Sequence, residues 1–110
     1  MQPDIPDMNQ SMFEIQAEFC KAMGSAVRLQ LVHVLREHPM TVGEICRATD
    51  LPQSNVSRHL KALRAVGVLN SKRHGIEIVY QLADIKIAEV CDLVRSILVD
   101  QIHKRSQSIE

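Results

Sequence analysis

The sequence predicts a mainly α-helical domain that carries one small β-hairpin. Apolar residues recur every three or four positions through most of the 110 residues, as they do on one face of an α-helix. Between residues 68 and 82 the period shortens to two, which is typical of β-strands. We therefore expect about five helices and a two-stranded hairpin.

The first two expected helices are separated by Gly24. Apolar residues at helical spacing run from about Met8 to Met23, and Gly24 ends this helix. Ser25 can cap the second helix through its side-chain oxygen, and that helix ends near His38. Its apolar face consists of Val27, Leu31, Val34 and Leu35.

Two shorter helices joined by a tight turn follow. Thr41 and Glu44 have the spacing of a capping box, which begins a helix that ends near Thr49. The turn Asp-Leu-Pro-Gln-Ser leads to a second helix from about Gln53 to Val66, and Gly67 ends it. The inward-facing residues of this second helix are Val56, Leu60 and Leu63. Two short helices in this arrangement form a helix-turn-helix motif.

The expected hairpin comes directly after this motif. Val68–Lys72 and Ile76–Leu82 are the predicted strands, with His74 and Gly75 in the turn. In the second strand the apolar residues alternate with polar ones and are Ile76, Ile78, Tyr80 and Leu82. A hairpin with a basic tip at this position is a wing.

A long final helix is expected from Ile85 to about Lys104. Its apolar positions are Ile87, Val90, Cys91, Val94, Ile97, Leu98 and Ile102. This face is wider than the core of one small domain requires, so we assign the excess to a dimer interface shared with the first helix.

The charges are balanced overall but not locally. The chain has 13 basic and 13 acidic residues, yet Leu51–Ile76 contains no acidic residue. The basic residues of that segment are Arg58, Lys61, Arg64, Lys72 and Arg73. A one-sided charge of this kind is typical of a surface that binds a polyanion such as DNA.

The second helix of the motif has the side chains of a recognition helix. Short polar residues at its start, together with one arginine, suit contacts to base edges: Gln53, Ser54, Asn55, Ser57 and Arg58. The residues better placed for phosphates are Lys61, Arg64, Lys72 and Arg73. His74, in the turn of the wing, is a further candidate for a DNA contact. His59 is either a packing or phosphate-contact residue or a base reader. The alternative for Lys61 and Arg64 is the solvated face of an amphipathic helix.

These elements divide the chain into three segments. Residues 1–7 contain two prolines and predict a flexible N-terminal arm. Residues 8–105 predict a single DNA-binding and dimerisation domain, and residues 106–110 a C-terminal tail.

Several classes of protein are excluded by the composition. No run approaches the roughly 20 apolar residues that cross a bilayer, and the N-terminus lacks the regions of a signal peptide, so we expect a cytoplasmic protein without a membrane partner. No Ser/His/Asp set, glycine-rich phosphate loop or close carboxylate pair is evident, so the sequence does not predict an enzyme.

The segments Phe19–Leu35 and Thr41–Leu82 resemble the winged-helix repressors of the ArsR/SmtB family, and the resemblance extends roughly from Phe19 to Leu98. The most specific matching residues are Ser54, Val56, Ser57, His59, Leu60, Leu63 and Gly67. This resemblance implies a homodimer joined by its first and last helices. It also implies that the dimer binds a palindromic operator and leaves it when a small inducer binds.

The metal sites known in this family are not matched. Where metal-sensing members carry two cysteines on the third helix, this chain has Thr41 and Gly43. Where zinc-sensing members carry two histidines on the last helix, it has Lys86 and Ile97, although both acidic positions are kept. Neither lysine nor isoleucine can bind Zn²⁺ here, so we predict no metal site and no cofactor.

Cys20 and Cys91 are the remaining candidates for sensing. They lie on the two helices expected to pack together, and they are either small buried hydrophobic residues or a dithiol sensor. Such a sensor would close as a disulfide or polysulfide bridge, or bind a thiophilic ion, and shift the dimer geometry. Family members that sense persulfide have a cysteine where this chain has His33, and Cys46 is expected to be structural.

The predicted function is that of a homodimeric transcriptional repressor. The alternatives are a winged-helix module for protein interaction and a regulator without intrinsic ligand sensing.

Overall fold

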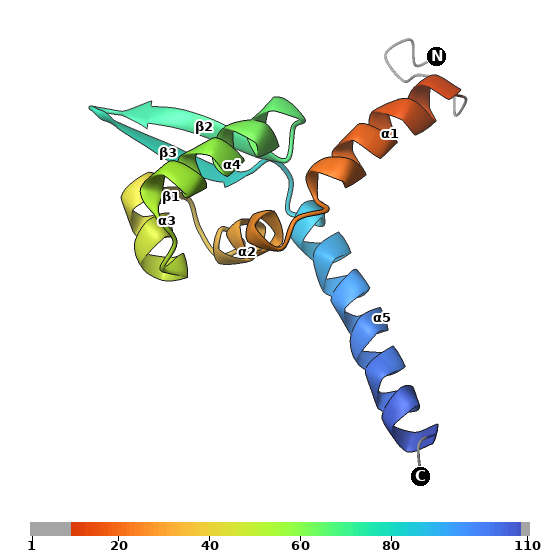
Figure 1. The fold of residues 1–110 in the computed structure, drawn as a ribbon. Helices are drawn as coiled ribbons and strands as arrows, with labels where there is room; N and C mark the ends of the chain where they lie inside the picture. The colour runs from red at the N-terminus through yellow and green to blue at the C-terminus, as the bar shows by residue number, and fades with distance from the viewer. Residues whose placement is uncertain (1–9, 109–110) are drawn as a thin grey trace.

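The computed structural model describes residues 10–108, which form five helices and three strands (Figure 1). In chain order these are α1 (Gln10–Ala22), α2 (Ala26–Val34), β1 (Met40–Thr41), α3 (Val42–Thr49), α4 (Gln53–Ala65), β2 (Leu69–His74), β3 (Glu77–Leu82) and α5 (Lys86–Ser108). The expected arm, residues 1–7, lies outside the described residues.

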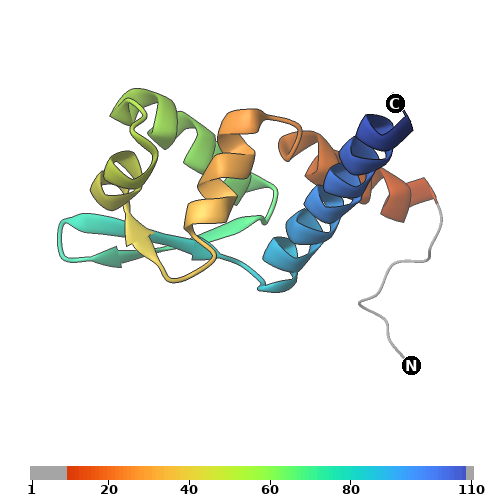
Figure 2. The same cartoon turned by 90° about the horizontal axis from the view of Figure 1, so that it is seen from below.

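The helices and the sheet form two layers from which α1 and α5 project. Figure 2 shows α2, α3 and α4 on one side of the sheet. The hairpin of β2 and β3 extends in one direction, whereas α1 and α5 leave the domain on the opposite side (Figure 1). This is the winged helix-turn-helix fold that the sequence predicts.

The sheet has three antiparallel strands in the order β1-β3-β2, one more than expected. Met40 pairs with Tyr80 and Thr41 with Val79. A strand of two residues is too short to produce a periodic pattern, which is why the sequence did not reveal it.

The predicted N-terminal caps of α2 and α3 are both present. The Ser25 side chain accepts a hydrogen bond from the backbone N–H of Arg28 at 3.3 Å and caps α2. The backbone N–H of Thr41 donates to Glu44 Oε1 at 2.8 Å, and the N–H of Glu44 donates to Thr41 Oγ1 at 3.2 Å, which confirms the capping box. The bond from the Thr41 backbone lowers the pKa of Glu44.

The core is aliphatic and lies between the helices and the sheet. As predicted, Val56, Leu60 and Leu63 of α4 are fully buried. Other fully or almost fully buried residues are Leu31, Val32, Leu35, Ile45, Val68 and Leu69. The position of α4 is therefore fixed by its inner face.

The hairpin differs from the prediction at its tip. His74 pairs with Glu77, so Gly75 and Ile76 form the turn and His74 ends β2. Gly75 has a φ of 63°, which glycine adopts without strain. Tyr80 faces the core, as the alternating pattern predicts, and is 4% exposed. Ile76, in contrast, is 96% exposed because the tip of the hairpin extends beyond the helices.

The last helix is longer than predicted. It continues to Ser108, so residues 106–108 of the expected tail are helical, and residues 109–110 lie outside the described part. No glycine or proline interrupts the sequence after Lys104. None of the helices in residues 10–108 has the length and apolar character of a membrane span.

Candidate nucleic-acid interface

All of the predicted DNA-contact residues lie on two neighbouring elements. Gln53, Ser54, Asn55, Ser57, Arg58, His59, Lys61 and Arg64 are on α4, and Lys72, Arg73 and His74 are on β2. Because the opposite face of α4 is held in the core, these polar and basic side chains occupy its outer and flanking faces. Asn55, Ser57 and His59 are half-buried, and the others are exposed.

Two of the predicted base readers contact each other. Arg58 Nη2 donates a hydrogen bond to Asn55 Oδ1 at 2.6 Å, one turn earlier on α4. Only one of the five N–H donors of the guanidinium is used in this bond. Arg58 is thus oriented on the surface and keeps donors for a further partner.

A second contact joins α4 to the wing. Arg64 Nη1 donates to Ser71 Oγ on β2 at 2.9 Å, and both residues border the junction of helix and strand. This bond holds the Arg64 guanidinium beside the strand that carries Lys72 and Arg73. A hydrogen bond therefore links the basic side chains of α4 to the strand that carries those of the wing.

His59 makes a contact that sequence reasoning did not find. Arg28 Nε, from the first turn of α2, donates to His59 Nδ1 at 3.0 Å. The pKa of His59 is lowered, first by burial and then by the positive charges of Arg28 and Arg58. The two residues are 31 positions apart, so no local pattern indicates the pairing.

Cys20 and Cys91 line the same groove between α1 and α5, which has a volume of about 620 Å³. Its apolar walls are formed by Phe19, Met23, Leu29, Ile87, Val90, Val94 and Leu98. Cys20 is exposed and Cys91 is half-buried, and burial raises the pKa of the Cys91 thiol. Cys46, expected to be structural, packs against the core.

Two of the residues that stand at the family's metal-ligand positions have structural contacts of their own. Thr41 caps α3, and Lys86 forms an ion pair with Asp84 at 3.7 Å. Among residues 10–108 there is no group of three or more His, Cys, Asp or Glu side chains that could hold a metal ion.

Comparison with known proteins agrees with this geometry. The family model described as "Bacterial regulatory protein, arsR family" matches residues 25–71. The transcriptional repressor PagR of Bacillus anthracis is 36% identical over 85 residues, which cover 76% of this chain and 85% of PagR. The repressor SmtB of Mycobacterium tuberculosis is 38% identical over 79 residues, and the matched segment spans 72% of this chain but only 58% of SmtB.

Solved structures agree as well. The crystal structure of Rv0081 from Mycobacterium tuberculosis superposes with a TM-score of 0.77 at 30% identity, covering 88% of this chain and 98% of that one. The family match includes the whole helix-turn-helix, and the likeness to PagR extends over most of both chains. The chain therefore belongs to the ArsR/SmtB family of winged helix-turn-helix transcriptional regulators.

Proposed function

We propose that this protein is a homodimeric repressor that binds a palindromic DNA operator in the cytoplasm and is released from it by an inducer. The observation that carries this proposal is the surface of α4 and β2, which presents basic and short polar side chains without an acidic residue between positions 51 and 76. Two relatives of this chain, SmtB and PagR, are transcriptional repressors.

The start of α4 supplies the groups that read bases. In the major groove, arginine recognises guanine through two N–H donors, and asparagine recognises adenine. Arg58 and Asn55 have these side chains, and the hydrogen bond between them orients Arg58 before DNA is bound. Gln53, Ser54 and Ser57 supply further polar contacts on the same helix.

The remaining basic residues hold the duplex by its phosphates. Lys61 and Arg64 lie farther along α4, and Lys72, Arg73 and His74 lie on the outer part of β2. Phosphate contacts fix the orientation of a protein on DNA without reading its sequence. Because Arg64 is bound to Ser71, its guanidinium lies at the junction of α4 and β2. From this position the helix and the wing can contact the phosphates of the same DNA strand.

The second protomer is proposed from the apolar surface of α1 and α5. Phe13, Ile15, Val94 and Leu98 are each about half exposed or more. The radius of gyration is 16.8 Å, against about 13 Å for a compact domain of this length. A second copy that packs its own α1 and α5 against these faces would cover them, and a two-fold dimer matches a palindromic site.

The groove between α1 and α5 supports a thiol-based inducer response. The exposed Cys20 is the thiol that an oxidant reaches, whereas the half-buried Cys91 has a raised pKa. With peroxide as the oxidant, Cys20 forms a sulfenic acid, which condenses with the Cys91 thiol to a disulfide and releases water. A bridge in this place would alter the packing of the dimer.

Binding titrations on duplex DNA test the proposal. The probe is the duplex of about 30 base pairs that the wild type enriches from a random-sequence pool, with an unselected duplex for comparison. We expect specific binding that weakens steeply with salt and is lost when Arg58 and Lys61 are changed to glutamate.

Lys104→Glu, an exposed lysine near the end of α5, is the matched control for charge. The proposed interface would be contradicted if the affinity for DNA did not depend on salt concentration. It would also be contradicted if Arg58→Glu, Lys61→Glu and Lys104→Glu changed the affinity equally.

A further inference from the structure

One side chain connects three helices of the domain. Arg28 lies in the first turn of α2, and its Nε donates to Nδ1 of His59 in the middle of α4 at 3.0 Å. Its Nη1 donates to the backbone carbonyl of Ala22, the last residue of α1, at 3.3 Å. Arg28 and His59 are half-buried and Ala22 is buried, so the link is partly shielded from solvent.

The chemistry of this link requires a neutral His59. An arginine Nε–H can only donate, and the guanidinium does not lose its proton in proteins. Nδ1 of His59 must therefore carry a lone pair, and the ring proton is on Nε2. A protonated ring has no acceptor to offer and would place a second positive charge against Arg28.

The surroundings of His59 favour the neutral ring. The charged groups that act on it are Arg28 from α2 and Arg58 from its own helix, and both are cations. Burial first, and then these two positive charges, hold the pKa of His59 below the ordinary value of 6.5. At neutral pH the link is therefore intact.

We propose that Arg28 is a positioning residue for DNA binding, and that its bond to a neutral His59 fixes the orientation of α4 relative to α1. This inference rests on the proposed function. Ala22 follows Cys20, a groove residue, by two positions, so the link also joins the dimerisation surface to the recognition helix. When His59 is protonated, the bond is lost and specific DNA binding weakens.

The sign of the pH effect distinguishes this role from a simple charge effect. A histidine that only approached phosphates would strengthen binding on protonation, because positive charge favours DNA. His59 should do the opposite. His74 on the wing is a second histidine of the proposed interface, so a variant that changes His59 alone is needed.

Two substitutions separate the possibilities. His59→Asn keeps an acceptor at the Nδ1 position, since the amide oxygen is bonded to Cγ as Nδ1 is, but it cannot be protonated near pH 6. Arg28→Lys keeps the positive charge, but a single ammonium on a flexible stem does not reproduce the planar donor pair. The probe is the duplex enriched by the wild-type protein.

We expect Arg28→Lys to bind the duplex about tenfold more weakly at pH 7.5, the effect of losing one charge-assisted hydrogen bond. As the pH falls below the pKa of His59, the affinity of the wild type for the duplex should decrease by a similar factor relative to the affinity of His59→Asn. Imidazole ¹⁵N shifts of the free wild-type protein should show the Nε2–H form of His59, and Arg28→Lys should show a mixture and a higher pKa.

The outcomes separate this inference from the proposed function. A wild type that binds no duplex overturns both. If the wild type binds the duplex and Arg28→Lys has the same affinity, pH profile and ¹⁵N shifts, the inference alone is overturned. A wild type that binds more tightly than His59→Asn as the pH falls also overturns it.

Discussion

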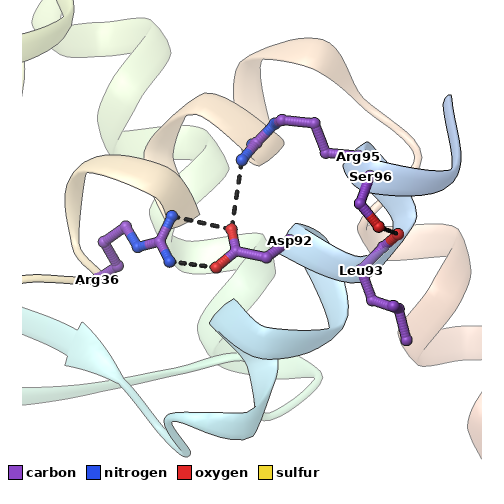
Figure 3. Close-up of polar contacts among 5 residues, drawn as sticks. All are labelled: Arg36, Asp92, Leu93, Arg95 and Ser96. Atoms are coloured by element: carbon purple, nitrogen blue, oxygen red, sulfur yellow. Dashed lines mark hydrogen bonds and ion pairs between the residues drawn. The ribbon is translucent and has the colours of Figure 1, made fainter. Parts of the chain in front are cut away.

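Arg36, two residues beyond the end of α2, binds the carboxylate of Asp92 on α5 with both terminal nitrogens of its guanidinium (Figure 3). The bond from Nη1 to Oδ1 is 2.8 Å long, and Arg95 Nη1 donates to the same oxygen at 3.3 Å. Within the described chain, the buried residues of α5 are Ile87 and Ala88, near its start. The ion pair thus adds a polar contact between α5 and the segment after α2, beyond these buried residues.

This ion pair predicts how stability depends on pH. The hydrogen bond from Arg36 lowers the pKa of Asp92 below its ordinary value of 3.8. The stabilising contribution is therefore complete above that value and is lost as the pH falls below it. Urea denaturation across the acid range should show a shallower decline for Asp92→Asn than for the wild type. Asp100→Asn, on the same helix, should decline as the wild type does, and identical curves for all three proteins would contradict a role for the pair.

Removal of buried side-chain volume from α4 should destabilise the domain. Leu60 is fully buried, so Leu60→Ala should lower the free energy of unfolding by about 2–5 kcal/mol. The neighbouring Lys61 is exposed, and Lys61→Ala should change this free energy by no more than about 0.5 kcal/mol. Denaturant titrations that give equal effects would show that the inner face of α4 is wrongly assigned.

Arg58 and Lys61 should differ in how they affect DNA recognition. If Arg58 reads a base, Arg58→Ala should cost about 1–3 kcal/mol on the enriched duplex and narrow the difference from unselected DNA. Lys61→Ala should weaken binding to both duplexes alike and reduce the salt dependence. Fluorescence anisotropy titrations on both duplexes measure this, and equal losses of discrimination for the two variants would overturn the assigned roles.

The apolar face of α5 should be required for dimerisation. Leu98 is 51% exposed in the single chain, and a charge buried there in an interface would be unpaired. Leu98→Glu should therefore raise the dimer dissociation constant by about a hundredfold or more. Sedimentation equilibrium measures this, with Gln101→Glu, an exposed polar position on the same helix, as the control. A wild type that is monomeric at micromolar concentration would contradict the proposed dimer.

The two groove cysteines should account for any thiol response. The variant that carries both Cys20→Ser and Cys91→Ser should keep its DNA affinity and lose release by peroxide, polysulfide or arsenite. Zn²⁺ at stoichiometric amounts should release neither protein, because the family's ligand positions are replaced. If the variant and the wild type respond alike to every reagent, the cysteines are packing residues and the sensor proposal is wrong.

Interactions between residues close in sequence were predictable from the sequence. The Ser25 cap and the Thr41–Glu44 capping box each join residues three positions apart, so side-chain chemistry and spacing suffice to specify them. The inner face of α4 was predictable for the same reason, since its period follows from helix geometry. The change from a helical period to a period of two likewise indicated the hairpin that follows the helix-turn-helix.

Contacts between distant segments could not be predicted in this way. Arg36 and Asp92 are 56 positions apart, and Arg28 and His59 are 31 apart. Each pair depends on how whole helices pack, and no periodic pattern contains that information. The hairpin turn was misplaced by one residue because both His74-Gly75 and Gly75-Ile76 include the glycine that the turn requires, whereas only cross-strand pairing sets the register.

Thr41 belongs to the sheet and to the helix-turn-helix at once. It pairs with Val79 of β3, and its side chain caps α3. Arg64 of α4 is bound to Ser71 of β2, so each helix of the helix-turn-helix has a polar link to the sheet. In the proposed dimer, each protomer would therefore present its helix-turn-helix and its wing to DNA as one unit. In the proposed function, an inducer that changes the separation of the two recognition helices would release the dimer, because that separation has to match the number of base pairs between the half-sites.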